Sequence, residues 1–275
     1  MIKETKIIAL LILLTAPLLV SGQVEYIGLA PFKTTDINNY AEAEAITEKV
    51  KELFSERNRF TVLDRTKYSQ TIIYKEIEVQ KNIEYIEGYV IEQGKQNGAE
   101  AIVGGNLTSL TYGKDKNGLY ECSMTFSITI NDIENGHVIG SKNFNTPAFC
   151  LTCAGGTKTE TLSSVLRILQ KKIRSFIIET FPITVDIEDV YESKGGGEII
   201  IIAGEKEGIT AKDKFKVYEI IKSGNRTRKA EILEFNINRV EGDFSVGKIK
   251  GKKFDLLLEK FKNPNAKLEC VTLSK

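Results

Sequence analysis

Two Asn-Gly turns that frame one alternating segment constrain the fold of this chain most strongly. The dipeptides lie at 117–118 and 135–136, and both residue types accept the positive φ angles of tight hairpin turns. Between them, residues 120–133 alternate apolar and polar side chains, as a half-buried strand does. Together with residues 101–112 before and 138–144 after, the pattern predicts three consecutive antiparallel strands.

Helical periodicity lies on both sides of these strands. The first helix is predicted after a strand at 24–32, and one face of it carries Ala43, Ile46, Val50, Leu53 and Phe54. Residues 60–63 form a short strand, residues 66–96 have a mostly helical pattern, and a last helix runs from about Glu160 to Thr180. The order β-α-β-α-β-β-β-α predicts an α/β layer in which helices pack on a mixed sheet.

The pattern changes at Phe181-Pro182, which we take as a domain boundary at about residue 182. Strands and turns alone are expected from here on, with the strands at 183–190, 199–203, 214–221, 229–240, 244–249 and 267–273. Short strands with regular breaks predict a small all-β barrel or sandwich. The expected division is therefore residues 23–181 and residues 182–275, after a leader.

The leader is a predicted signal peptide over residues 1–22. Lys3 and Lys6 give a positive start, residues 7–20 are almost wholly apolar, and Gly22 ends a small-residue cleavage site. The apolar run is shorter than the ~20 residues that span a bilayer, which argues against a retained membrane anchor. Because no cysteine follows Gly22, we expect an exported protein that is not lipidated.

Charge and composition narrow the class of partner. The chain has 38 basic and 37 acidic residues, of which Lys3, Lys6 and Glu4 belong to the leader, so the mature chain is neutral. A neutral chain has no overall field to hold a polyanion, which argues against nucleic acid as the partner. A hydrophobic content of 41% predicts a packed core rather than disorder.

Four cysteines offer the sharpest local chemistry. Cys150 and Cys153 form a C-x-x-C motif, and Cys122 and Cys270 are the other two. A redox dithiol is favoured where the first thiolate lies at a helix N-terminus, but the predicted helix begins several residues later. We therefore favour a structural disulfide between Cys150 and Cys153, or two buried thiols, and keep a dithiol oxidoreductase as the least favoured interpretation.

No catalytic, cofactor or metal residue is assigned. His137, the single histidine, stands beside a predicted turn, where a surface position is the simplest interpretation. Gly195-Gly-Gly197 is followed by neither a helix nor Lys-Ser/Thr, so we interpret it as a strand connection rather than a phosphate loop. The protein is expected not to be an enzyme.

Basic residues cluster after residue 220, at Arg226, Arg228, Lys229, Lys248, Lys250, Lys252 and Lys253. Alternation at 248, 250 and 252 is typical of the solvated face of a strand. A glycan-binding or partner-binding patch is the alternative, and the sequence alone leaves the choice open.

Three segments of the first half resemble a known family. They are IGLAPF at 27–32, RFTVLDR at 59–65, and GAEAIVGG at 98–105 leading into NLT. Together they resemble the CsgG-like family, the curli production assembly and transport component, whose periplasmic domain is shared with the penicillin-binding-protein activator LpoB. The second half resembles the small β domain at the C-terminus of FlgT, through AG at 203–204, GIT at 208–210 and DKFKVY at 213–218.

The resemblance implies an anticodon-binding-domain-like α/β fold and a non-enzymatic role in envelope or curli-like surface-structure assembly, by protein–protein binding. It implies envelope proteins as partners, a periplasmic location with peripheral association with the outer membrane, and no cofactor. It leaves homo-oligomer formation open.

This sequence differs from the CsgG-like family in two ways that favour an accessory or scaffold protein. A subunit of a curli-type secretion channel stays the alternative. The resemblance implies that a curli-type channel forms its pore from two long hairpins inserted in this domain. The segments at the corresponding positions here, residues 111–120 and 145–158, are short and lack the apolar–polar alternation of membrane strands. The lipid-bearing cysteine is also missing.

Overall fold

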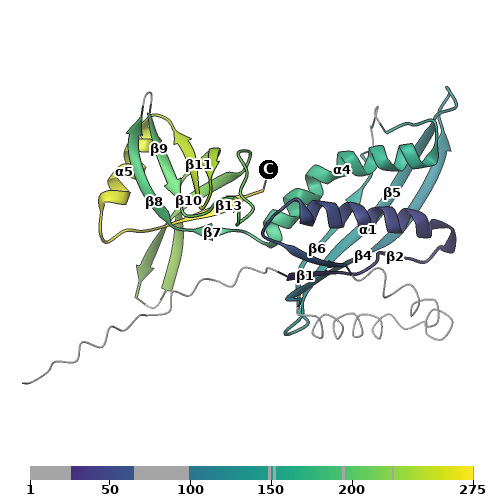
Figure 1. The fold of residues 1–275 in the computed structure, drawn as a ribbon, viewed down its shortest axis with the longest axis horizontal. Coiled ribbons are helices and arrows are strands. Elements are labelled where there is room, and N and C mark those ends of the chain that lie inside the picture. Colours follow the sequence, from purple (N-terminus) through teal and green to yellow (C-terminus); the bar gives the residue numbers. More distant parts are fainter. Residues whose placement is uncertain are drawn as a thin grey trace, which may run out of the picture.

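The computed structural model describes residues 26–64, 99–147, 150, 153–193, 196–224 and 226–274. The predicted signal peptide and the predicted helix at 66–96 lie outside the described residues. The described elements form two sheets that follow one another along the chain (Figure 1). Each sheet has its own hydrophobic cluster, one ending at Phe181 and the other beginning at Ile183.

The first sheet has the strand order β3-β1-β4-β5-β6, with β2 paired to β4. Its elements are β1 (Tyr26–Leu29), β2 (Lys33–Thr34), the 3-10 turn η1 (Ile37–Asn39), α1 (Tyr40–Ser55), β3 (Thr61–Asp64), β4 (Ala101–Lys114), β5 (Tyr120–Asp132), β6 (Val138–Asn145) and α4 (Lys158–Thr180). Strand β1 pairs in parallel with β3 and β4, whereas β4, β5 and β6 are antiparallel. The sheet is therefore mixed, and the meander is where its two Asn-Gly turns predict it, with φ of 80° at Gly118 and 73° at Gly136.

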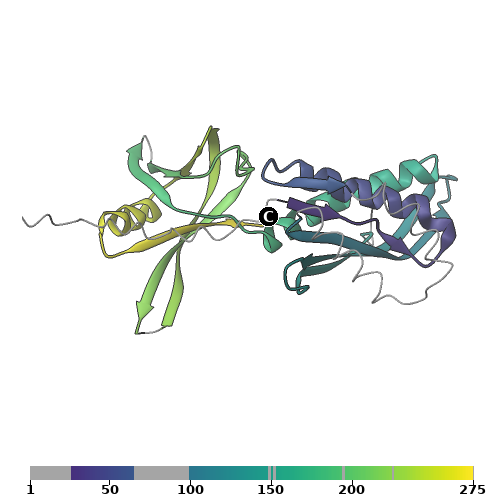
Figure 2. The same cartoon turned by 60° about the horizontal axis from the view of Figure 1, so that its bottom comes forward.

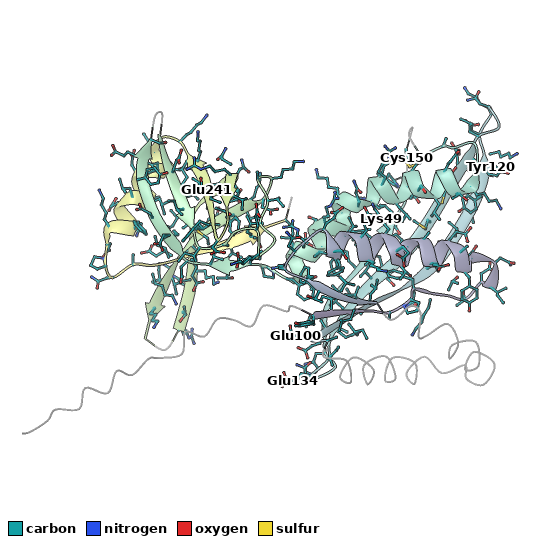
Figure 3. The ribbon with its side chains drawn as sticks, in the orientation of Figure 1. Lys49, Glu100, Tyr120, Glu134, Cys150 and Glu241 are labelled. Atoms are coloured by element: carbon teal, nitrogen blue, oxygen red, sulfur yellow. A yellow bond between two sulfur atoms is a disulfide. The ribbon has the colours of Figure 1, made fainter. Side chains whose placement is uncertain are left out.

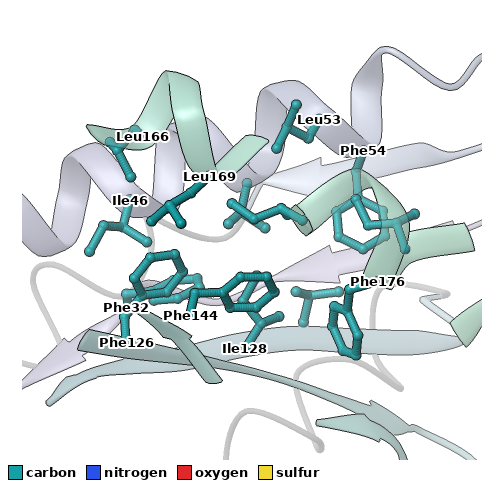
Figure 4. Close-up of a cluster of buried hydrophobic side chains, with 14 of the residues drawn as sticks. Phe32, Ile46, Leu53, Phe54, Phe126, Ile128, Phe144, Leu166, Leu169 and Phe176 are labelled. Carbon is teal, nitrogen blue, oxygen red and sulfur yellow. The ribbon is translucent and has the colours of Figure 1, made fainter. Parts of the chain in front are cut away.

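Helices α1 and α4 cover one face of this sheet. The main core lies between these two helices and the sheet (Figure 4). Alternate residues of β5 point into it, and Phe126 lies at its centre, fully buried. The Phe126 ring stacks on Phe144 at 5.2 Å and meets Phe32 edge-on at 6.1 Å. The apolar face of α1 is the one that the sequence predicts, because Ala43, Ile46, Val50, Leu53 and Phe54 are all buried.

Helix α4 begins at a capping box. The Thr157 side chain accepts from the backbone N–H of Glu160, and the Glu160 carboxylate accepts from the backbone N–H of Thr157. Two of the four N–H groups that a helix start leaves unpaired are satisfied in this way. The predicted start, at about Glu160, is close to the observed one.

The second sheet has the order β7-β13-β10-β11-β12-β9-β8. Its elements are β7 (Thr184–Val185), β8 (Ile187–Ser193), β9 (Gly196–Ile201), β10 (Lys214–Ser223), β11 (Arg226–Glu241), β12 (Phe244–Ile249), α5 (Lys252–Lys262) and β13 (Lys267–Leu273). Strands β7 and β8 are the two edge strands of this sheet, yet only Asp186 separates them in the chain. Strand β7 pairs with β13, and β8 pairs with β9 at the opposite edge. The sheet therefore curls into a half-barrel (Figure 2).

The expectation of strands and turns alone after residue 183 is wrong, because α5 is a helix of 11 residues. It buries Phe254 and Leu257 against the second sheet. Gly197 of β9 makes room for it, since a Cβ there would lie 1.9 Å from the Phe254 ring. The mixture of helix and sheet that the sequence predicts is confirmed, and it extends into the second half.

None of the helices that the structure describes is long and apolar enough to cross a membrane.

Candidate functional site

The two cysteines of the C-x-x-C motif are joined by a disulfide, Cys150–Cys153. They lie in the segment between β6 and α4, which is attached to β5 at both ends. The Thr146 N–H donates to the carbonyl oxygen of Met124 at 2.9 Å, and Tyr120 and Gly155 exchange two backbone hydrogen bonds. Figure 3 shows Tyr120 at the end of the first sheet that points away from the second sheet, and Cys150 beside α4.

This disulfide is not at a helix start. Helix α4 begins at Lys158 behind its own cap, Thr157, so neither cysteine is the cap residue or lies in the first turn. Cys153 is 4% exposed and packs in the main core, while Cys150 is half-buried at its edge. The surroundings are those of a link that fastens a loop.

A buried thiol and a carboxylate lie at the same end of the core. Burial, followed by the charge of Glu42, raises the pKa of Cys122 from 9.0 to about 11. The Tyr112 hydroxyl points to Glu42 Oε1 at 3.4 Å, and burial is the main cause that raises its pKa. Glu42 Oε2 is buried without a hydrogen-bond partner among the described residues. A thiol and a phenol are neutral at pH 7 in any case, and these shifts extend the neutral range of Cys122 and Tyr112 further into base.

The raised pKa of Cys122 predicts a loss of stability in base. The folded state keeps the proton between pH 9.0 and about 11, whereas the unfolded state releases it. The free energy of unfolding should therefore fall as pH rises through this range. Urea unfolding across the range should show a shallower fall for Cys122→Ala than for the unchanged chain, and equal slopes would contradict the assignment.

Other residues considered from the sequence are dispersed. His137 is exposed beside the turn before β6. Gly196 and Gly197 begin β9, while Gly195 lies outside the described residues. Of the alternating lysines, Lys248 alone is on a strand, since Lys250 follows the end of β12 and Lys252 begins α5. The strand-face interpretation of these lysines is therefore wrong for two of the three. Within the described ranges, no group of three or more His, Cys, Asp or Glu residues is placed to hold a metal.

Polar contacts concentrate instead where the two sheets meet. Arg57, in the turn between α1 and β3, forms a bidentate ion pair with Asp213, with N–O distances of 3.0 and 3.1 Å. Its Nη1 also donates to the carbonyl oxygen of Gly208 at 3.1 Å. The Asp213 carboxylate further accepts from the backbone N–H and the hydroxyl of Thr210, at 2.8 and 3.1 Å.

Both members of this ion pair are removed from water. The side chains of Arg57 and Asp213 are 15% and 9% exposed. In such surroundings a charge left without its partner is strongly unfavourable, so the pair holds the two loops together. Glycine is favoured at 208 because its φ is 70°, in the left-handed region that other residues rarely adopt.

Arg59 makes a second link, to the end of α4. Its guanidinium donates to the carbonyl oxygen of Phe181 and lies over the Phe60 ring, 4.4 Å from the centroid. A cation is favoured here because a helix C-terminus carries unpaired carbonyl groups. Burial, helped by the charge of Arg57, lowers the pKa of Arg59 from 12.5 to about 10, and the group remains charged at pH 7.

Three phenylalanines fix the position of these arginines. The rings of Phe54, Phe60 and Phe181 meet edge-on, with centroids 5.4 to 6.3 Å apart. They join the end of α1, the start of β3 and the end of α4. The second sheet begins directly beyond them, where Ile183 and Thr272 exchange hydrogen bonds. We call this set of contacts, from Arg57, Arg59 and Phe181 to Gly208, Thr210 and Asp213, the junction.

Sequence reasoning missed the junction as a site. Its members nevertheless fall inside or beside the segments that carry the family resemblances: Arg59 in the segment 59–65, Gly208 and Thr210 in 208–210, and Asp213 in 213–218. No local pattern could have paired them, because Arg57 and Asp213 are 156 positions apart.

The face of the first sheet opposite α1 and α4 is polar and almost free of charge. From Ser123 to Asn131 of β5, the residues that alternate with the buried ones bear hydroxyl or amide groups, while Glu121 is the charged residue at the end of this row. Most of their neighbours on β4 and β6 bear such groups too, and the exceptions are Gly104, Ile102 and Val138. We call this set the polar face: Asn106, Ser109, Thr111, Ser123, Thr125, Ser127, Thr129, Asn131, Ser141, Asn143 and Asn145. All of these side chains are exposed or half-buried.

No family model matches the chain, and no curated protein matches it either. Solved structures with a similar arrangement of elements include the PelC dodecamer from Paraburkholderia phytofirmans, at 9% identity and a TM-score of 0.35, covering 54% of this chain and 86% of that one. A lipoprotein from Neisseria meningitidis matches at 13% identity and a TM-score of 0.35, covering 54% and 96%.

The C-terminal domain of LpoB from Escherichia coli matches at 12% identity and a TM-score of 0.31, covering 46% of this chain and 84% of that one. Scores and identities this low assign neither a function nor a partner to this chain.

Proposed function

We propose that this chain is a non-enzymatic scaffold or accessory protein of the cell envelope, acting by binding other proteins in the assembly of an envelope or curli-like surface structure. The predicted signal peptide and the resemblance to the CsgG-like family support this role. They also support a periplasmic location with peripheral association with the outer membrane.

The junction is the observation that carries the proposal. A scaffold has to hold its binding surfaces in a defined geometry, and relative motion is the default for two units joined by one crossing of the chain. Here the buried ion pair of Arg57 with Asp213, and the hydrogen bond from Arg57 to Gly208, oppose that motion. Stiffness of this kind is expected of a protein that positions partners.

The polar face is the partner surface that we assign to the first sheet. In a chain of which 27% is charged, a solvated sheet face would carry lysine and glutamate at several of these positions. Hydroxyl and amide groups can instead be covered by a protein without burying an unpaired charge. The face spans β4, β5 and β6, and Thr129 and Ser141 already contact across two of these strands at 3.4 Å.

Site-specific photo-crosslinking in the exporting cell tests this role. A photoreactive residue at Ser127 or Asn143 should yield crosslinks to one defined envelope protein, identified by mass spectrometry. The matched control is the exposed Lys206, on the second half, where the same label should not capture that protein. Equal labelling at all three positions would contradict a partner on the polar face.

A fractionation of the same cells separates the scaffold from the secretion channel. A scaffold should be released without detergent, whereas membrane-bound rings of this chain would favour the channel.

A further inference from the structure

The hairpin formed by β10 and β11 extends beyond the rest of the second sheet (Figures 1 and 2). Strand β10 pairs with β13 up to Ile220 and Lys267, and β11 pairs with β12 from Asn236 onward. From Ile221 to Arg228 the two strands pair with each other alone. This part is a two-stranded ribbon with solvent at its tip.

The ribbon carries positive charge that its surroundings do not balance. Lys222, Arg226 and Arg228 are exposed, and the part of the chain that the structure describes gives none of them an ion pair. No acidic residue occurs from Ile220 to Ala230.

The acidic residues at the base of the hairpin are already occupied. Glu231 pairs with Lys216 at 2.9 Å, and Glu269 pairs with Lys229 at 3.0 Å. Glu219 in turn pairs with Lys260 at 2.9 Å. The three cations at the tip therefore remain available for an external anion.

The register places these cations around the tip. Arg226 lies opposite Ser223 and Arg228 lies opposite Ile221, so both arginines share one face of the ribbon. Lys222 lies opposite Thr227, on the other face. A folded acidic protein would contact one face of such a ribbon. A layer of anionic headgroups that the tip approaches end-on would contact both.

We propose that the β10–β11 ribbon binds the surface of an anionic membrane through Lys222, Arg226 and Arg228. The long side chains of Lys and Arg can reach the headgroup layer while the backbone stays outside it. Each cation near an anionic bilayer strengthens binding by roughly fivefold, so the three together contribute about 100-fold. The interaction is independent of the proposed scaffold role, and it would orient the scaffold on a membrane.

Sedimentation with lipid vesicles tests the proposal on the full chain. We expect binding to vesicles that contain phosphatidylglycerol, weak binding to pure phosphatidylcholine, and a loss of binding as salt is raised. The triple variant Lys222→Ser, Arg226→Ser and Arg228→Ser should bind the anionic vesicles about 100-fold more weakly. The control variant Lys248→Ser, Lys250→Ser and Lys252→Ser removes the same charge elsewhere and should bind as the unchanged chain does.

Equal losses in the tip and control variants would overturn the proposal, because binding would then depend on total charge. Equal binding of the unchanged chain to both vesicle types would also overturn it, as would a preference for soluble polyglutamate over vesicles. Should the triple variant fail to fold, the three single variants replace it, and each is expected to bind the anionic vesicles roughly fivefold more weakly. Single variants that all bind as the unchanged chain does would overturn the proposal in the same way.

Discussion

The Asp213→Ala variant should lose about 3–5 kcal/mol of stability, because it leaves Arg57 charged, buried and without its partner. The substitution also removes the acceptor for the Thr210 backbone N–H and for its hydroxyl. Thermal and urea unfolding followed by circular dichroism measure the loss. A change of this size would show that the junction is a main support of the whole molecule.

An exposed ion pair of the same residue classes is the matched control. Lys206 and Asp243 lie 2.8 Å apart, but their side chains are 77% and 62% exposed. Lys206→Ala should therefore change stability far less than Asp213→Ala does. A second comparison replaces both Arg57 and Asp213 by leucine, which leaves no charge unpaired and should recover much of the stability. Similar losses for Asp213→Ala and Lys206→Ala would contradict the role of burial.

Phe126→Ala should lower the free energy of unfolding by about 3–5 kcal/mol, since it opens a cavity at the centre of the main core. The ring is fully buried and contacts both Phe32 and Phe144. The neighbouring residue, Ser127, points to the opposite face of the same strand. Ser127→Ala should change stability by less than about 0.5 kcal/mol.

The same urea titration measures both variants. A large loss for Ser127→Ala would show that the polar face is covered in the isolated protein, and it would contradict the partner surface that we propose.

The sequence predicts the three-stranded meander well, because both of its determinants are local. Asn-Gly dipeptides specify the turns, and alternation along β5 decides which side chains enter the core. The faces of α1 and α4 follow for the same reason, from apolar residues at helical spacing.

The sequence does contain a helical pattern for α5, which the prediction of strands and turns alone overlooked. Phe254, Leu257, Leu258 and Phe261 are spaced as one face of a helix, and all of them pack against the second sheet. The helix is short, its cap position is a glycine without a side-chain cap, and lysines surround it. Local propensity is weak for such a segment, and the packing of Phe254 over Gly197 stabilises it.

The junction could not be predicted, for a physical reason. Ion pairs and close loop contacts form between segments that only the folded chain brings together, and neither Arg57 nor Asp213 differs locally from the other charged residues of the chain. The division into two domains at about residue 182 stays a prediction. The two hydrophobic clusters fit it, whereas the buried junction predicts that the halves stabilise each other.

Spin-label distances across the junction test the central claim most directly. Labels at Asn143 and Lys248, both exposed, would report on the two sheets, while the native thiols of Cys122 and Cys270 are buried. We predict a narrow distance distribution for the unchanged chain and a clearly broader one for Asp213→Ala. A distribution that is already broad in the unchanged chain, and that Asp213→Ala leaves as it is, would contradict a scaffold of fixed geometry.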